Sequence, residues 1–140
     1  MRSFIIFCID VNAYAIDIES VKRILPYQDL TAMPDESEHI EGMFHYEDKI
    51  IKTLSFRKMI GLEPFKKDKN NQRCLIIIPK DNDAFSILID AVDEIVHIEE
   101  ENLHITSSKQ SIAGFMNVEA MLEHNGKLVT VIKDINIGDK

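Results

Sequence analysis

Residues 14–24 read YAIDIESVKRI, and residues 85–95 read FSILIDAVDEI, with apolar residues at the same spacing. In both stretches three apolar residues stand at every second position, at residues 14, 16 and 18 and at residues 85, 87 and 89. Two more follow at intervals of three residues, at 21 and 24 and at 92 and 95. The alternation is typical of a β-strand with one buried face. A continuous apolar run precedes each stretch, at residues 4–7 and 75–78. The chain therefore carries the same strand-rich pattern twice.

The later parts of the pattern also repeat in the same order. An Ile-x-Gly triplet stands at residues 40–42 and again at 112–114, and an apolar run closes each copy at residues 49–54 and 127–132. Short strands at regular spacing, with no long helix between them, are typical of barrels and sandwiches. A sheet of about five strands avoids open edges best by curling into a barrel. We therefore expect an all-β protein built from two small curled sheets.

The polar segment of residues 63–73 separates the two copies and is expected to connect two subdomains. The length of 140 residues suits one domain. We therefore predict a single domain over residues 1–140. Subdomain 1 is expected at about residues 11–66, and subdomain 2 at about residues 70–134 together with the N-terminal strand or its partner.

Turn and cap residues predict the local connections. Asn125-Gly126 lies between two apolar runs and favours a two-residue hairpin turn, because both residues tolerate positive φ. Asp48-Lys49 is expected to form the matching turn in the first copy. Residues 55–60 predict one short helix, with Ser55 as its N-cap and Gly61 ending it.

Composition argues against several kinds of function. The net charge is −8, and the densest basic stretch, residues 66–69, is short and interrupted by Asp68, so we expect no nucleic-acid binding. No apolar run approaches the roughly 20 residues of a membrane-spanning helix, so we expect a cytoplasmic protein without membrane insertion. Cys8 and Cys74 occupy equivalent strand positions and are expected to be small buried hydrophobes, not disulfide partners or metal ligands.

The sequence contains none of the common catalytic motifs, such as G-x-S-x-G, a P-loop or H-E-x-x-H. His39 and His45, near Glu41 and Glu47, are six residues apart, which is roughly 20 Å in a strand and too far to share a metal ion. We therefore expect no enzyme, no cofactor and no metal site. A small enzyme or metal protein with a β-barrel site stays open as an alternative of a different class.

The order of these signals resembles the CheW family, the adaptors that couple bacterial chemoreceptors to the histidine kinase CheA. The family's aromatic-x-Ile-Asp-Ile-x-x-Val-x-x-Ile motif matches residues 14–24, and its second-half signature matches residues 88–95. A helix start like the family's Asp-Leu-Arg stands at Ser55-Phe56-Arg57, and the family's closing pattern appears at residues 128–135. The resemblance spans nearly the whole chain.

The resemblance implies two five-stranded SH3-like β-barrel subdomains with one short helix, and no catalysis. In the family, one barrel binds the regulatory domain of the kinase, and the cytoplasmic hairpin tip of the chemoreceptor docks between the barrels. The resemblance therefore implies a chemotaxis signal-transduction adaptor that couples chemoreceptors to CheA in a receptor array. Such a protein would be cytoplasmic and associated with membrane-bound arrays.

The chain departs from the family pattern at two charged positions. His45-Tyr46-Glu47-Asp48 stands where family members usually carry Asn-Leu-Arg-Gly, and Arg23 stands where glutamate is common. We interpret the two changes as a swapped ion pair between Arg23 and Glu47. The loss of the Arg-Gly pair favours an alternative function, a diverged CheW-like scaffold of another motility or chemosensory system. Such a scaffold would bind a receptor or scaffold protein but not the kinase.

The resemblance also implies where partners bind. Apolar residues near a barrel edge would make the contact, and the two charged positions would lie at its rim. The predicted partner-binding residues are Val21, Arg23, Leu30, Ile40, Gly42 and Glu47.

Overall fold

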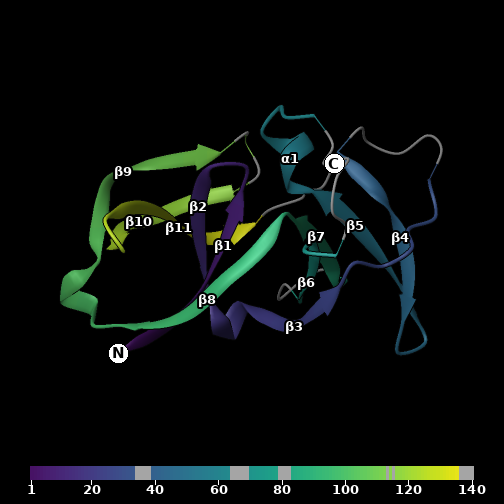
Figure 1. The fold of residues 1–140 in the computed structure, drawn as a ribbon, viewed down its shortest axis with the longest axis horizontal. Coiled ribbons are helices and arrows are strands. Elements are labelled where there is room, and N and C mark those ends of the chain that lie inside the picture. The colour runs from purple at the N-terminus through teal and green to yellow at the C-terminus, as the bar shows by residue number, and fades with distance from the viewer. Residues whose placement is uncertain (34–38, 64–69, 79–82, 113, 115, 136–140) are drawn as a thin grey trace. The chain divides into compact units, whose positions relative to one another are not determined.

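A computed structural model describes residues 1–33, 39–63, 70–78, 83–112, 114 and 116–135 of the chain (Figure 1). The connection expected at residues 63–73 lies partly outside the described residues, and the basic stretch at residues 66–69 lies wholly outside them.

The described residues are mostly β-structure, with one α-helix and two single-turn 3-10 helices. The strands are β1 (Arg2–Ile9), β2 (Asn12–Asp17), β3 (Val21–Pro26), β4 (Ile40–Tyr46), β5 (Lys49–Ser55), β6 (Arg73–Ile77), β7 (Phe85–Ile89), β8 (Ala91–Ile98), β9 (His104–Ile112), β10 (Met116–His124) and β11 (Lys127–Ile135). The helices are η1 (Ile18–Ser20), α1 (Phe56–Met59) and η2 (Glu100–Asn102).

The strands form two sheets. One has six strands in the order β8-β1-β2-β11-β10-β9, and the other has five strands in the order β3-β6-β7-β5-β4. The all-β prediction is confirmed, but the expectation of two five-stranded barrels needs correction. The first sheet has a sixth strand, and neither sheet closes through its described strands, because β8 and β9 remain the edges of one and β3 and β4 the edges of the other.

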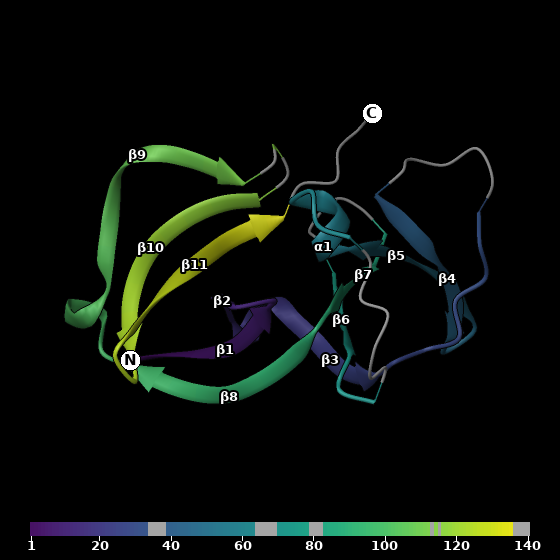
Figure 2. The same ribbon diagram turned by 45° about the horizontal axis from the view of Figure 1, so that its top comes forward.

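The two sheets repeat one strand order, and the order explains the sixth strand. Matching β1, β2, β3, β4 and β5 of the first copy with β6, β7, β8, β10 and β11 of the second turns β3-β6-β7-β5-β4 into β8-β1-β2-β11-β10. The strand left over is β9, which pairs with β10 (Figure 2). In the first copy the corresponding place beside β4 is taken by a single bridge between Thr31 and Met43. A single bridge stands there in place of the several residue pairs that join β9 to β10, so the five-stranded sheet does not gain a further strand.

Each sheet combines strands from both sequence copies. A parallel pair joins them in each case, β2 with β11 and β5 with β7. As a result, the chain divides into unit 1, Met1–Ser20 with Val92–Lys140, and unit 2, Val21–Ala91. The expected subdomains were about residues 11–66, and about residues 70–134 together with the N-terminal strand or its partner; the two units divide the chain at other residues, because strands of the two copies pair with each other.

The hairpin turns follow their backbone requirements. β10 ends at His124 and β11 begins at Lys127, and the turn residues Asn125 and Gly126 have φ of 53° and 79°, which confirms the prediction. Positive φ at both central residues is the mark of a type I′ turn. In the first copy the turn residues are Glu47 and Asp48, with φ of 50° and 63°. The expected turn at Asp48-Lys49 is therefore wrong by one residue, because Lys49 already pairs with Tyr46.

The one short helix lies where the sequence predicts it. The Ser55 side chain accepts a hydrogen bond from the Lys58 backbone N–H at 3.1 Å and so caps the helix at its N-terminus. Phe56 and Met59 are buried, so tertiary packing holds a helix too short to be stable alone. None of the described helices has the length and apolarity needed to cross a membrane.

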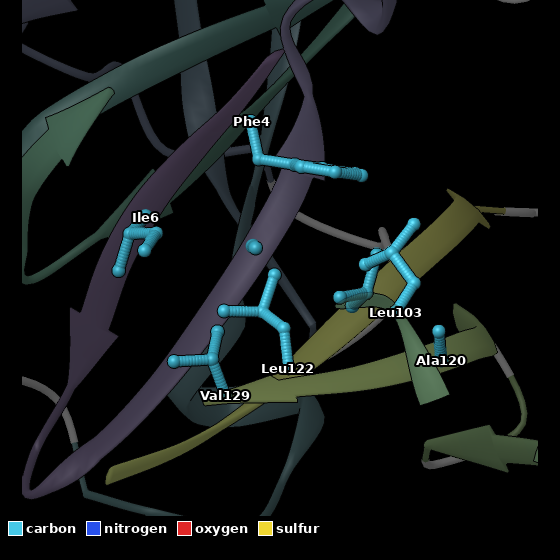
Figure 3. Close-up of a cluster of buried hydrophobic side chains, with 8 residues drawn as sticks. Phe4, Ile6, Leu103, Ala120, Leu122 and Val129 are labelled. Carbon is cyan, nitrogen blue, oxygen red and sulfur yellow. The ribbon is translucent and has the colours of Figure 1, made fainter. Parts of the chain in front are cut away.

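Each unit has its own apolar core. In unit 1 the core draws on β1, β2, β10 and β11 and on the residue after η2 (Figure 3); its members are Phe4, Ile6, Ala15, Leu103, Ala120, Leu122, Val129 and Val131. In unit 2 the buried cluster is Phe44, Ile51, Cys74, Ile76 and Leu88. Cys74 is therefore a core residue as predicted, whereas Cys8 is only half-buried. Burial raises the pKa of the Cys74 thiol.

Candidate partner-binding site

The predicted partner-binding residues all belong to unit 2 and lie on or beside the edge strands of its sheet, which Figure 1 labels β3 and β4. Val21 and Arg23 are on β3, Leu30 follows β3, Ile40 and Gly42 are on β4, and Glu47 is in the turn after β4. Because β3 and β4 are opposite edges, the pairing of the strands does not by itself bring these residues together. Other contacts must do so.

The segment that follows β3 joins one edge to the other. The Thr31 N–H donates to the Met43 carbonyl at 2.9 Å, and the Met43 N–H donates to the Thr31 carbonyl at 3.0 Å. A Cβ placed on Gly42 would lie 2.8 Å from both the Leu30 Cβ and the Thr31 carbonyl oxygen. Gly42 therefore permits a close backbone crossing, and the structure brings Leu30 and Gly42 together.

Leu30 and Gly42 mainly support this surface from within. Leu30 is half-buried and packs against the core cluster that contains Phe44. Gly42 is buried, and Ile40 is half-buried beside it. These three residues shape the edge at β4, whereas Arg23 and Glu47 are exposed and can contact a partner directly.

Both edge strands carry a β-bulge with a charged extra residue. On β3, Val21 and Arg23 pair with consecutive residues of β6, so Lys22 is the extra residue. On β4, Ile40 and Gly42 likewise pair with consecutive residues of β5, so Glu41 is the extra residue. Bulges redirect side chains at sheet edges. Each of the two redirected side chains makes an ion pair, Lys22 with Glu47 and Glu41 with Lys58.

The bulge on β3 corrects the expected pairing of Arg23 with Glu47. Glu47 pairs with Lys22, whose Nζ lies 3.4 Å from Glu47 Oε1. No ion pair of the described residues joins Arg23 to Glu47. The bulge redirects the side chain of Lys22, and Lys22 is the basic residue of β3 that meets Glu47. Both side chains are about half exposed, so the pair contributes at most about 1 kcal/mol.

A second ion pair in unit 2 is largely buried. Arg57 Nη1 donates to Asp90 Oδ2 at 2.6 Å, and the two side chains are 13% and 8% exposed. Arg57 Nε also donates to the Glu63 carbonyl at 2.6 Å. These bonds hold α1 to the end of β7. Both residues lie in the motifs quoted above, but their spacing of thirty-three residues gives no local signal that they meet.

A shallow cavity lies beside the turn at Glu47. Its volume is about 250 Å³, and Lys49, Ile50, Ile51, Asp83 and Ala84 line it. Ile50 is 58% exposed, which makes it one of the large apolar side chains open to solvent in unit 2. Along β5, exposed Ile50 and Lys52 alternate with buried Ile51 and Thr53, as expected for a strand with one buried face.

Among the residues that the structure describes, the histidines of unit 2 belong to no converging set of metal-ligand atoms. His45 is exposed on β4, and neither it nor His39 belongs to a set of converging ligand atoms among the described residues. The described residues contain one such set, Asp93, Glu94 and His124, and it belongs to unit 1.

An all-β fold whose two sheets repeat one strand order, with exposed charged residues at the edge strands of unit 2, is typical of a binding module of the adaptor type. The CheW-like domain family matches residues 3–135, and the chain belongs to this family. CheW is a family of non-enzymatic adaptors and scaffolds, and the chain has a chemotaxis adaptor role.

Several known proteins are similar to the chain. The chemotaxis protein CheW of Thermotoga maritima is 21% identical over 123 residues, which cover 88% of this chain and 78% of that protein. The chemotaxis protein CheW of Bacillus subtilis is 21% identical over 139 residues, or 99% of this chain and 88% of that protein. The crystal structure of the scaffolding protein TtCheW from Thermoanaerobacter tengcongensis superimposes with a TM-score of 0.83 at 24% identity, covering 96% of this chain and 90% of that one. This structural likeness confirms the fold.

Proposed function

We propose that this protein couples chemoreceptors to the histidine kinase CheA as a non-enzymatic adaptor in a receptor array. The observation that carries the proposal is the family match over residues 3–135, together with a strand order that repeats in both units. The proposed partners are the cytoplasmic hairpin tip of the chemoreceptor and the regulatory domain of CheA. The protein would then act in the cytoplasm, held at the membrane by the receptors it binds.

Within unit 2, we assign the predicted site residues two different tasks. Arg23 and Glu47 are exposed and would contact the partner, with the open side chain of Ile50 adding apolar area. Val21, Leu30, Ile40 and Gly42 would set the shape of the edge, because each is buried or half-buried. Individual contacts need only modest affinity, because an array holds its components close together.

The charges at this edge support a second candidate function. Glu47 and Arg23 stand where the resemblance led us to expect the opposite charges, and Glu47 is already engaged by Lys22. A kinase surface that is complementary to the usual family pattern would meet like charges here, which costs affinity. The alternative is a CheW-like scaffold that binds a receptor or another scaffold protein but not the kinase.

Binding measurements separate the two candidates. The full chain is immobilised and exposed separately to a chemoreceptor cytoplasmic hairpin and to the CheA regulatory domain of the same organism. Binding to both supports the coupling function, binding to the receptor alone supports the scaffold, and binding to neither contradicts both.

A charge reversal then tests the edge itself. Arg23→Glu should change the affinity for a partner that docks on β3, whereas Lys133→Glu, an exposed charge on β11 of unit 1, serves as the matched control. Equal effects of the two substitutions would contradict the assignment of this edge.

A further inference from the structure

Three potential metal ligands converge in unit 1, whereas every residue assigned to partner binding above belongs to unit 2. The ligand atoms of Asp93, Glu94 and His124 all lie within 4.8 Å of one another, and Glu94 Oε2 contacts His124 Nε2 directly. Asp93 and Glu94 are on β8, and His124 is the last residue of β10.

The three residues meet because the six-stranded sheet curls. In the strand order, β1, β2 and β11 lie between β8 and β10, so strand pairing alone would keep these residues apart. Figure 2 shows how β8 and β10 curve within unit 1. Contacts among these three residues connect two non-adjacent strands, β8 and β10, and can therefore stabilise the curvature of the sheet.

The donor set favours a particular class of cation. One imidazole nitrogen and two carboxylate oxygens match the ligands of Zn²⁺, which binds nitrogen and oxygen at about 2.0–2.2 Å in four-coordinate sites. Mg²⁺ and Ca²⁺ prefer oxygen ligands alone. The histidine therefore distinguishes this group from an ordinary pair of exposed carboxylates.

The local structure positions His124 and offers a fourth donor. The His124 side chain is 19% exposed and immediately precedes the type I′ turn at Asn125-Gly126, which fixes its backbone. The Asn125 side-chain amide nitrogen lies 3.3 Å from His124 Nε2. Rotation of this amide by half a turn would present its carbonyl oxygen to the same place, because the amide carries a donor at one corner and an acceptor at the other.

We propose that Asp93, Glu94 and His124, with Asn125 beside them, form a binding site for one divalent cation of the zinc class. The bound cation joins β8 to the β10–β11 hairpin across the curl of the sheet. Because the cation binds the folded protein, it also raises the stability of unit 1, by an amount that grows with the logarithm of its concentration relative to its dissociation constant.

Calorimetric titration of the full chain with Zn²⁺, after removal of metals by a chelator and desalting, tests the proposal. We expect one equivalent of Zn²⁺ to bind. His124→Ala and Glu94→Gln should each weaken binding by at least about tenfold, because each removes a ligand. His45→Ala, which removes an exposed histidine of unit 2, is the matched control and should leave the affinity unchanged. Millimolar Mg²⁺ should not compete.

Thermal unfolding provides a second measurement on the same variants. At the same concentration, Zn²⁺ should raise the Tm of the wild-type chain by more than it raises the Tm of Glu94→Gln. Glu94 is exposed, so this variant folds even if His124→Ala disturbs the turn. The proposal is wrong if no stoichiometric binding is found. It is also wrong if the two ligand variants bind as the wild type does, or if His45→Ala loses affinity to the same extent, which would indicate adventitious binding to surface histidines.

Discussion

Arg57 donates a hydrogen bond of 2.6 Å to Asp90 from a largely buried position, and this bond fastens the only α-helix of the described residues to the end of β7. Removing one member of such a pair leaves a buried charge without its counter-charge. We therefore expect Arg57→Ala and Asp90→Asn each to lower the free energy of unfolding by about 3–5 kcal/mol, measured by urea denaturation. Arg23→Ala, an exposed arginine of the same unit, should change it by less than about 0.5 kcal/mol. A small effect of both buried substitutions, equal to that of the control, would contradict the role of the bond.

The close approach at Gly42 predicts a steric effect. Gly42→Ala places a Cβ 2.8 Å from the Leu30 side chain and from the Thr31 carbonyl, and part of that contact is backbone, which cannot turn aside. We expect a loss of about 1–3 kcal/mol in the free energy of unfolding, as for other overpacked sites. His45→Ala on the same strand is exposed and provides the control. A fully stable Gly42→Ala variant would show that the crossing segment moves freely.

The ion pair between Lys22 and Glu47 predicts a weak, salt-sensitive coupling. A double-mutant cycle on these two residues should give less than about 1 kcal/mol, decreasing as ionic strength rises. The same cycle on Arg23 and Glu47 should give no coupling. A larger coupling for Arg23 than for Lys22 would restore the pairing that the sequence suggested.

The two type I′ turns predict opposite effects of exchanging their residues. Glu47 and Asp48 adopt positive φ with side chains that disfavour it, whereas Asn125-Gly126 is well suited. Replacing Glu47 and Asp48 with Asn and Gly should raise the free energy of unfolding by about 1 kcal/mol. The reverse exchange at Asn125 and Gly126 should lower it by a similar amount. Thermal unfolding of the two double variants measures both effects. If replacing Glu47 and Asp48 with Asn and Gly lowers the stability, a type I′ turn at these two residues is contradicted.

The buried thiol of Cys74 predicts a pH dependence at the alkaline end. Burial raises the pKa of Cys74, so the folded chain keeps a proton that the unfolded chain loses above about pH 8.5. Its contribution to stability is complete below that pH and is lost as the pH rises through the higher folded value. Urea denaturation at pH 8 and pH 10 should show a smaller decrease for Cys74→Ala than for the wild type. In the native state a thiol reagent should modify the half-buried Cys8 before Cys74.

The sequence predicted features that depend on local pattern. Alternating apolar residues located β2 and β7, the Asn125-Gly126 pair located the second hairpin, and Ser55 located the helix cap. Each signal reflects a preference of a few consecutive residues for one backbone conformation. The charge reversals at positions 23 and 47 could also be found from the sequence, because these positions were compared with the usual residues of the CheW family.

Other features depend on register and on distant pairing, which leave no local signal. The bulge at Lys22 shifts the strand by one residue without changing the apolar pattern around it, so the partner of Glu47 could not be predicted. β9 was missed because residues 104–112 are mostly polar. His124 lies thirty residues from Glu94, and only the curl of the sheet brings them together.

The parallel pairs of β2 with β11 and of β5 with β7 tie the ancestral copies to each other so that neither can stand alone. A chain cut between them would give two fragments, each holding some strands of one sheet and the remaining strands of the other. Such fragments would have to associate in order to fold. After the duplication, therefore, neither copy could be lost without removing strands from both sheets.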